Sequence, residues 1–132
     1  MPERLVWVVD VRVQGGPQIG QSDTLEIEAY DKIAVTLEPG DAYHEIELQP
    51  GAPAQIRLLL ITANNYSPDL LYGINGAPAD DAAAVRLDGL QLFMGTGAVG
   101  LLGSDPPRSI HVKNQTGESV DLEILVGRDA TP

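Results

Sequence analysis

The chain has 132 residues, of which 43% are hydrophobic, and 19 acidic against 8 basic residues give a net charge of -11. This length suits one domain with its own core, so we expect a single domain over residues 1–132. A surface of that sign repels nucleic acid phosphates and anionic lipid headgroups, which excludes direct binding to either as an expected function. The absence of cysteine excludes disulfides and thiolate metal sites.

The apolar run at residues 5–9 is too short for the core of a signal peptide, and Asp10 and Arg12 follow it directly. No apolar run approaches the length of about 18 residues that a membrane helix requires. We therefore expect neither a signal peptide nor a transmembrane segment.

Apolar and polar residues alternate along the chain with the two-residue period of a β-strand. The alternation is found in residues 5–13, 25–30, 33–37, 45–48, 87–94, 109–113 and 120–126. Two further strands are predicted at residues 55–63, which are apolar on both faces, and at residues 70–76, which end in an Asn-Gly turn. Turn sequences such as Glu38-Pro39-Gly40-Asp41 separate these segments and favour antiparallel pairing. The one expected helical turn, residues 77–84, is short. We predict an all-β fold, an antiparallel β-sandwich of jelly-roll type with about eight to nine strands and almost no helix.

Two segments are expected to lie outside the strands. Residues 14–24 are predicted to form a polar loop because Gly15-Gly16-Pro17 interrupts the first strand. Residues 127–132 are predicted to form a C-terminal tail. Trp7 alternates with Val9 and Val11, so we expect it to lie in the core.

Few residues suit catalysis. His44 and Ile46 share one strand face while Glu45 and Glu47 share the other, so His44 and a neighbouring glutamate do not converge on one ion. His111 lies between the apolar residues Ile110 and Val112 of a predicted strand, so we expect it to face solvent. The chain has neither a G-x-S-x-G motif nor a P-loop. We therefore expect no enzyme and assign no catalytic, cofactor-binding or metal-ligating residue.

The run from Gly95 to Gly100 spells G-x-G-x-x-G, the pattern of dinucleotide-binding loops. Such a loop needs a long helix after it, and here Gly103 and Pro106-Pro107 interrupt the chain instead. The expected alternatives are a kinked internal strand, a subunit contact and, with the least support, a nucleotide-binding enzyme. Close packing at these glycines predicts that Gly97→Val or Gly100→Val disrupts folding or assembly.

The strand at residues 55–63 is apolar on both faces, so we expect it to be central or covered by a partner. With the apolar residues 98–102, it points to an interface within a homo-oligomer or with a larger protein. The candidate interface residues are Leu59, Ile61, Tyr66, Leu70, Tyr72, Gly97, Val99, Gly100, Leu101 and Leu102.

A ligand-binding module is the alternative function. Tyr66 and Tyr72 flank a loop and are candidates for stacking on a carbohydrate. The oxygen-rich pairs Asp80-Asp81 and Ser104-Asp105 suit calcium, although nothing matches the EF-hand spacing.

The C-terminal third contains four notable segments. They are Leu87-Asp88-Gly89-Leu90-Gln91-Leu92-Phe93, Gly95 to Leu102, Val112-Lys113-Asn114-Gln115-Thr116 and Val120 to Asp129. In these segments the chain resembles small all-β virion proteins of tailed bacteriophages. The resemblance implies a non-enzymatic structural part, a capsid decoration or tail component, assembled in the host cytoplasm and carried on the virion. The partners it implies are copies of the chain itself or a larger virion protein.

Overall fold

The structure, a computed structural model, describes residues 3–49, 55–103 and 105–129. Its strands are β1 (Glu3–Arg12), β2 (Gln18–Ile27), β3 (Ala29–Leu37), β4 (His44–Glu47), β5 (Ile56–Ala63), β6 (Leu70–Ile74), β7 (Val85–Arg86), β8 (Gln91–Met94), β9 (Ser109–Asn114) and β10 (Val120–Arg128). Helical structure within these ranges is limited to α1 (Thr96–Val99) and the 3-10 turns η1 (Asp81–Ala83) and η2 (Gly100–Leu102). The predicted all-β class is confirmed.

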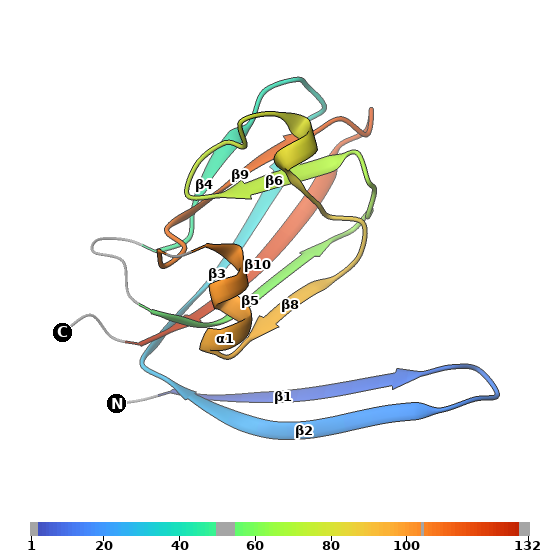
Figure 1. Cartoon of the computed structure of the whole chain (residues 1–132), viewed down its shortest axis with the longest axis vertical. Coiled ribbons are helices and arrows are strands. Elements are labelled where there is room, and N and C mark those ends of the chain that lie inside the picture. Colours follow the sequence, from blue (N-terminus) through green and yellow to red (C-terminus); the bar gives the residue numbers. More distant parts are fainter. Residues whose placement is uncertain (1–2, 50–54, 104, 130–132) are drawn as a thin grey trace.

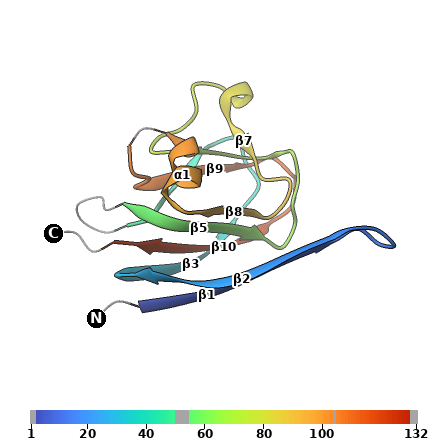
Figure 2. The same cartoon turned by 60° about the horizontal axis from the view of Figure 1, so that its bottom comes forward.

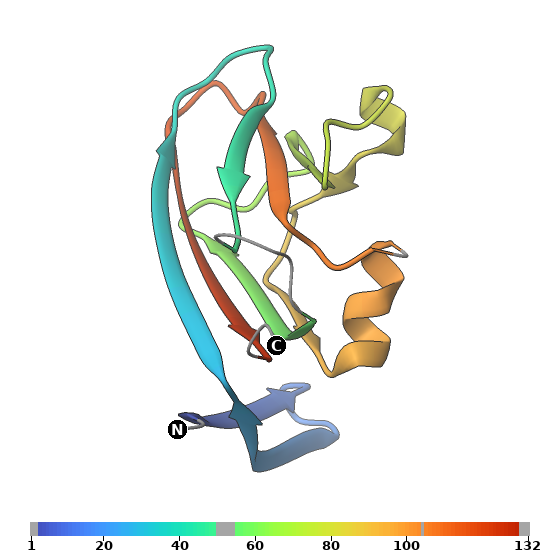
Figure 3. The same cartoon turned by 90° about the vertical axis from the view of Figure 1, so that its left-hand side faces the viewer.

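Eight of the strands form two antiparallel sheets, shown facing each other in Figure 3. The β3 sheet has the order β3-β10-β5-β8 and the β4 sheet has the order β4-β9-β6-β7. The first and last of these strands pair, as do β4 with β9, β5 with β8, and β6 with β7. Four nested pairs divided between two sheets give the topology of a jelly roll.

The core between the two sheets is aliphatic, as expected of a chain with one Trp and one Phe. Alternation places Leu59, Ile61 and Ile124 of the β3 sheet inward, and Ile110 and Val112 of the β4 sheet face them. Tyr72 is the largest buried side chain and directs its hydroxyl to the side-chain oxygen of Gln91. Burial raises the pKa of Tyr72 to about 12.

Strands β1 and β2 form a separate two-stranded hairpin, which we call the arm (residues 3–27). Figures 1 and 2 show that its turn extends beyond the sandwich. The predicted loop over residues 14–24 is wrong, because β2 begins at Gln18 and only a short turn separates the strands. The start of β2 is exposed on both faces, so its sequence needs no apolar alternation.

The predicted burial of Trp7 in the core is also wrong. Trp7 lies on β1 of the arm and is half-buried rather than enclosed between the two sheets. The alternation of Trp7 with Val9 and Val11 identifies one face of a strand correctly, but a local pattern does not indicate what covers that face.

Ile27 anchors the arm to the outer face of the β3 sheet. It is 3% exposed, and a Cβ atom added to Gly127 would lie 3.1 Å from its Cδ1. The same added atom would lie 3.6 Å from the Cβ of Leu58, so Ile27 and Leu58 both pack over this glycine. The arm thus covers the outer face of β5 at one end, which explains how a strand apolar on both faces is accommodated.

Ile27→Ala is expected to loosen the attachment of the arm, because removing a buried isoleucine side chain leaves a cavity over Gly127. The amide of Glu28, which donates to the carbonyl of Arg128 over 3.0 Å, should then exchange its hydrogen about tenfold faster. Hydrogen exchange measured by NMR tests this expectation. Val8→Ala, at a position 74% exposed, is the matched control; equal exchange rates in both variants would contradict the anchoring role.

The predicted tail over residues 127–132 needs correction at its start. Gly127 and Arg128 belong to β10, and the N–H of Asp129 still donates to the carbonyl of Gln55. Residues 130–132 lie outside the described part of the chain. Glycine, usually a weak strand residue, suits position 127 because a Cβ atom there would crowd the Ile27 side chain.

Candidate functional site

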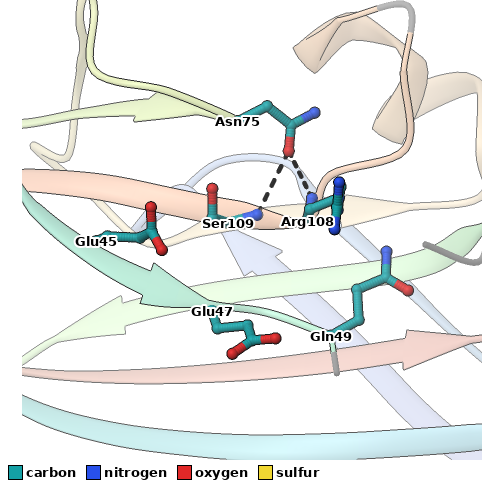
Figure 4. A pocket seen from close by; sticks show the side chains of 6 residues that line it. All are labelled: Glu45, Glu47, Gln49, Asn75, Arg108 and Ser109. Carbon is teal, nitrogen blue, oxygen red and sulfur yellow. Dashed lines mark hydrogen bonds between the residues drawn. The ribbon is translucent and has the colours of Figure 1, made fainter. Parts of the chain in front are cut away.

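A polar pocket of about 360 Å³ lies on the β4 sheet and is shown in Figure 4. Its lining residues are Glu45, Glu47, Gln49, Asn75, Arg108 and Ser109. The side-chain oxygen of Asn75 accepts hydrogen bonds from the backbone N–H groups of Arg108 (2.6 Å) and Ser109 (3.4 Å). This amide therefore fixes the wall of the pocket instead of facing a ligand.

A serine, a histidine and a carboxylate meet beside this pocket. Ser109 Oγ lies 3.2 Å from His111 Nε2, and Glu45 Oε2 lies 3.5 Å from the same nitrogen. A Ser-His-carboxylate triad needs the serine and the carboxylate on opposite ring nitrogens, so that one nitrogen takes the proton while the other is oriented. Both partners here compete for Nε2, so the arrangement does not activate Ser109.

The candidate calcium residues Asp80 and Asp81 have structural roles. Asp80 caps η1 by accepting from the N–H of Ala83 over 3.0 Å. Asp81 Oδ1 lies 2.7 Å from Lys113 Nζ and accepts from the Tyr43 hydroxyl over 2.9 Å. Across residues 3–49, 55–103 and 105–129, no group of three or more metal-ligating side chains was found.

The prediction that His111 faces solvent needs correction, because its side chain is 17% exposed, and on the same face of β9 lies the buried Lys113. The Lys113 side chain is 10% exposed, and its ammonium lies 4.8 Å from the centre of the Tyr43 ring. The hydrogen bond from Lys113, followed by that from Tyr43, lowers the pKa of Asp81. Burial, followed by the hydrogen bond to Asp81, raises the pKa of Tyr43 to about 12.

Asp81→Asn should remove a pH-dependent part of the stability. Because the pKa of Asp81 is lower in the folded state than its usual 3.8, the ionised carboxylate stabilises the fold above that pH and ceases to do so as the pH falls through the lowered pKa. Urea unfolding between about pH 7 and pH 3 should therefore show the free energy of unfolding of the wild type falling toward that of the variant. A constant difference across this range would contradict the assignment. Tyr43→Phe, which keeps the ion pair and removes the second hydrogen bond, should lose a smaller part of the pH dependence.

The glycine-rich segment forms neither a kinked strand nor a long helix. Gly95 and Gly103, with φ of +89° and +153°, begin and end a short helical segment comprising α1 and η2. A Cβ atom at Gly97 or Gly100 would meet nothing within 4 Å, so the predicted close packing at these two positions is wrong within the chain. A helix of this length offers no site for a pyrophosphate.

The ten candidate interface residues are divided between the core and the surface. Leu59, Ile61, Leu70 and Tyr72 are at most 1% exposed, and Val99 is 6% exposed. Their side chains are covered by the chain itself, so the prediction that they contact a partner is wrong. Leu102 is half-buried against the core, whereas Leu101 is 84% exposed and Tyr66 is 36% exposed.

Burial of Tyr72 also removes one half of the predicted sugar platform. Of the two tyrosines, Tyr66 is partly exposed and Tyr72 is buried, and a single partly exposed ring offers a sugar little stacking area. The two tyrosines were grouped by their positions in the sequence, but Tyr72 lies on β6 with its ring directed into the core.

The most exposed apolar side chains outside these candidates gather on the arm, which the sequence analysis did not identify as an interface. They are Val6 (69%), Val8 (74%), Val11 (62%), Val13 (60%) and Ile19 (74%). Val6 and Val8 lie on one face, and Val11 and Ile19, which are opposite each other in the hairpin register, lie on the other face. The signal in the sequence is the run of valines at both odd and even positions of the first strand.

Comparisons with protein-family models, with curated proteins and with solved structures gave no match to this chain. In the described part of the chain, no helix is long and apolar enough to cross a membrane.

Proposed function

We propose that this chain is a non-enzymatic structural subunit of a tailed-phage virion, a capsid decoration or tail component. It acts through protein–protein contacts with copies of itself or with a larger virion protein. The observation that carries this proposal is the arm, which extends beyond the sandwich and exposes apolar side chains on both faces.

Exposed apolar side chains on the arm favour assembly because burying them releases free energy, at about 25 cal/mol for each Å² of apolar surface removed from water. Single exposed apolar residues are common on protein surfaces, but a contiguous group on a projecting element is typical of an interaction site. Val6 and Val8 on one strand face form such a group.

The fold and the resemblance of the C-terminal third support the same function. Jelly rolls include viral capsid domains, but they also include lectins, so the fold alone does not choose between a structural and a binding role. The pocket in Figure 4 is the feature that favours the second candidate, a carbohydrate-binding module, since its carboxylates and amides are hydrogen-bonding groups. It lacks an aromatic lining residue, so we place it second.

Two measurements test the proposed function. Sedimentation velocity at micromolar concentration should show association of the full chain, and immunogold electron microscopy should find the chain on particles released from cells that encode it. A chain that stays monomeric and labels no particle would contradict the proposal. Specific binding on a glycan array that is lost in Glu47→Gln would favour the carbohydrate-binding module instead.

A further inference from the structure

We propose that the arm joins two copies of the chain through the open edge of β1. In this pairing, β1 of one copy lies antiparallel to β1 of a second copy across a two-fold axis, and Trp7 faces Trp7 at that axis. The two hairpins then form one continuous four-stranded sheet. This inference rests on the proposed function as an assembly subunit and names its contact surface.

The first argument is the direction of the backbone groups of β1. The N–H of Val13 donates to the carbonyl of Pro17 over 2.9 Å, which closes the turn of the hairpin. In an antiparallel pair, hydrogen-bonded and non-bonded positions alternate, so the odd residues of β1 bond to β2. The N–H and C=O groups of the even residues from Arg4 to Arg12 therefore point away from β2.

These outward groups form an open edge whose middle, from Leu5 to Val9, is not protected by charge, proline or glycine. Among the described strands, β1 pairs with β2 alone. Its residues include neither proline nor glycine, and four of its ten residues are valine. Natural edge strands commonly carry proline, bulges or charges that prevent pairing with another chain. The charges of β1 lie at its two ends, so the uncharged run from Leu5 to Val9 is a template for strand addition.

The opposite edge of the arm is less available. Arg57 Nη1 donates to the outward carbonyl of Glu26 on β2 over 3.4 Å. The chain then continues into β3, and the N–H of Glu28 donates to the carbonyl of Arg128. The body of the molecule therefore occupies the base of the β2 edge. The base of β1 approaches the body beside Tyr30 and Leu125, but among the described residues no backbone hydrogen bond joins β1 to the body.

Charge also selects the arm as the place where two copies meet. Residues 5–22 contain two charged side chains, Asp10 and Arg12, which lie 3.0 Å apart and neutralise each other. The remainder of the chain thus carries the whole net charge of -11. Two copies repel each other through their bodies but not through this neutral segment. The other long open edge, β3, lies within the acidic segment between Asp23 and Glu47.

The register follows from complementary charges. With Trp7 on the axis, Val6 of one copy faces Val8 of the other, and Arg4 faces Asp10. Each of these pairs joins even residues, so their outward N–H and C=O groups meet, and the two Arg4–Asp10 contacts add opposite-charge cross-strand pairs. Sliding the strands to place Val8 on the axis would set Arg4 against Arg12, which is unfavourable.

The decisive experiment compares two substitutions at Val8, whose outward N–H joins the proposed sheet. Val8→Pro removes this N–H without removing a bond to β2, and proline is tolerated at such edge positions. Sedimentation equilibrium should show that the dissociation constant of the Val8→Pro dimer is about a hundredfold higher than that of the wild type, because two symmetric hydrogen bonds are lost. Val8→Thr keeps the N–H and the branched shape and loses only one methyl group from the apolar surface, so its dissociation constant should rise by less than about tenfold, far less than that of Val8→Pro.

The register has its own test. Arg4→Asp and Asp10→Arg should each weaken the dimer by about fivefold by placing like charges opposite each other, and the double variant should recover most of the affinity. Because Asp10 also accepts hydrogen bonds from Arg12 and Gln18 within the arm, NMR of each variant should verify that the hairpin is retained. A double variant no better than the single ones would overturn the register.

The outcomes separate this inference from the proposed function. If the wild type associates but Val8→Pro associates equally well, or if Val8→Thr alone abolishes association, the edge pairing is overturned while the assembly role stands. If the wild type is monomeric yet labels particles, the pairing is also overturned and a larger protein is the partner. A monomer that labels no particle overturns both.

Discussion

Leu59→Ala is expected to lower the free energy of unfolding by about 3 kcal/mol. Leu59 is fully buried on β5 among residues of both sheets, so truncation removes its apolar contacts and leaves a cavity. For a domain of this size the melting temperature should fall by about 10 °C. Urea and thermal unfolding followed by circular dichroism measure the effect.

Leu101→Ala is the matched control for that substitution. Leu101 was predicted for the same interface but is 84% exposed, so its truncation should change the unfolding free energy by less than about 0.5 kcal/mol. If Leu59→Ala melted like the wild type and changed only the sedimentation coefficient, Leu59 would be an interface residue after all. That result would contradict its place in the core.

Gly73→Ala is expected to destabilise the fold by about 1–3 kcal/mol, because the site is already filled. An added Cβ atom would lie 2.8 Å from the carbonyl oxygen of Gly76 and 2.8 Å from Cδ of Pro78. The backbone of β6 would have to move to relieve these contacts, and β6 pairs with both β7 and β9. Chemical denaturation would report the change as a lower midpoint.

Gly97→Ala provides the opposite expectation for a glycine of the G-x-G-x-x-G run. Its added methyl group meets open space within α1, and alanine favours helix over glycine by about 1 kcal/mol. The variant should therefore be as stable as the wild type or slightly more stable. Loss of stability in Gly97→Ala together with none in Gly73→Ala would reverse the interpretation of which glycine is packed.

The sequence predicted the strands well because their pattern is local. Strands expected at residues 5–13, 55–63 and 120–126 agree with β1, β5 and β10 to within about two residues at most ends, since alternation and turn residues act within a few positions. The antiparallel jelly roll followed from the number of strands and the turns between them. The polar start of β2 was missed because exposed strands carry no apolar pattern.

The candidate site was predicted less well, since exposure depends on contacts between distant residues. The sequence identified Leu59 and Leu101 equally as apolar side chains needing cover, and only the pairing of β5 with β10 and β8 placed one in the core and the other outside. The G-x-G-x-x-G run likewise gave no indication that its glycines face open space.

By itself, then, the sequence determined the class of fold, the aliphatic core and the acidic surface, because composition and a two-residue period are properties of the chain. Only the tertiary structure decided that Ile27 packs over Gly127 and that the first hairpin forms a two-stranded sheet of its own. The contact between Ile27 and Gly127 joins residues about a hundred positions apart in the chain. No local pattern encodes which distant surface covers a given strand face.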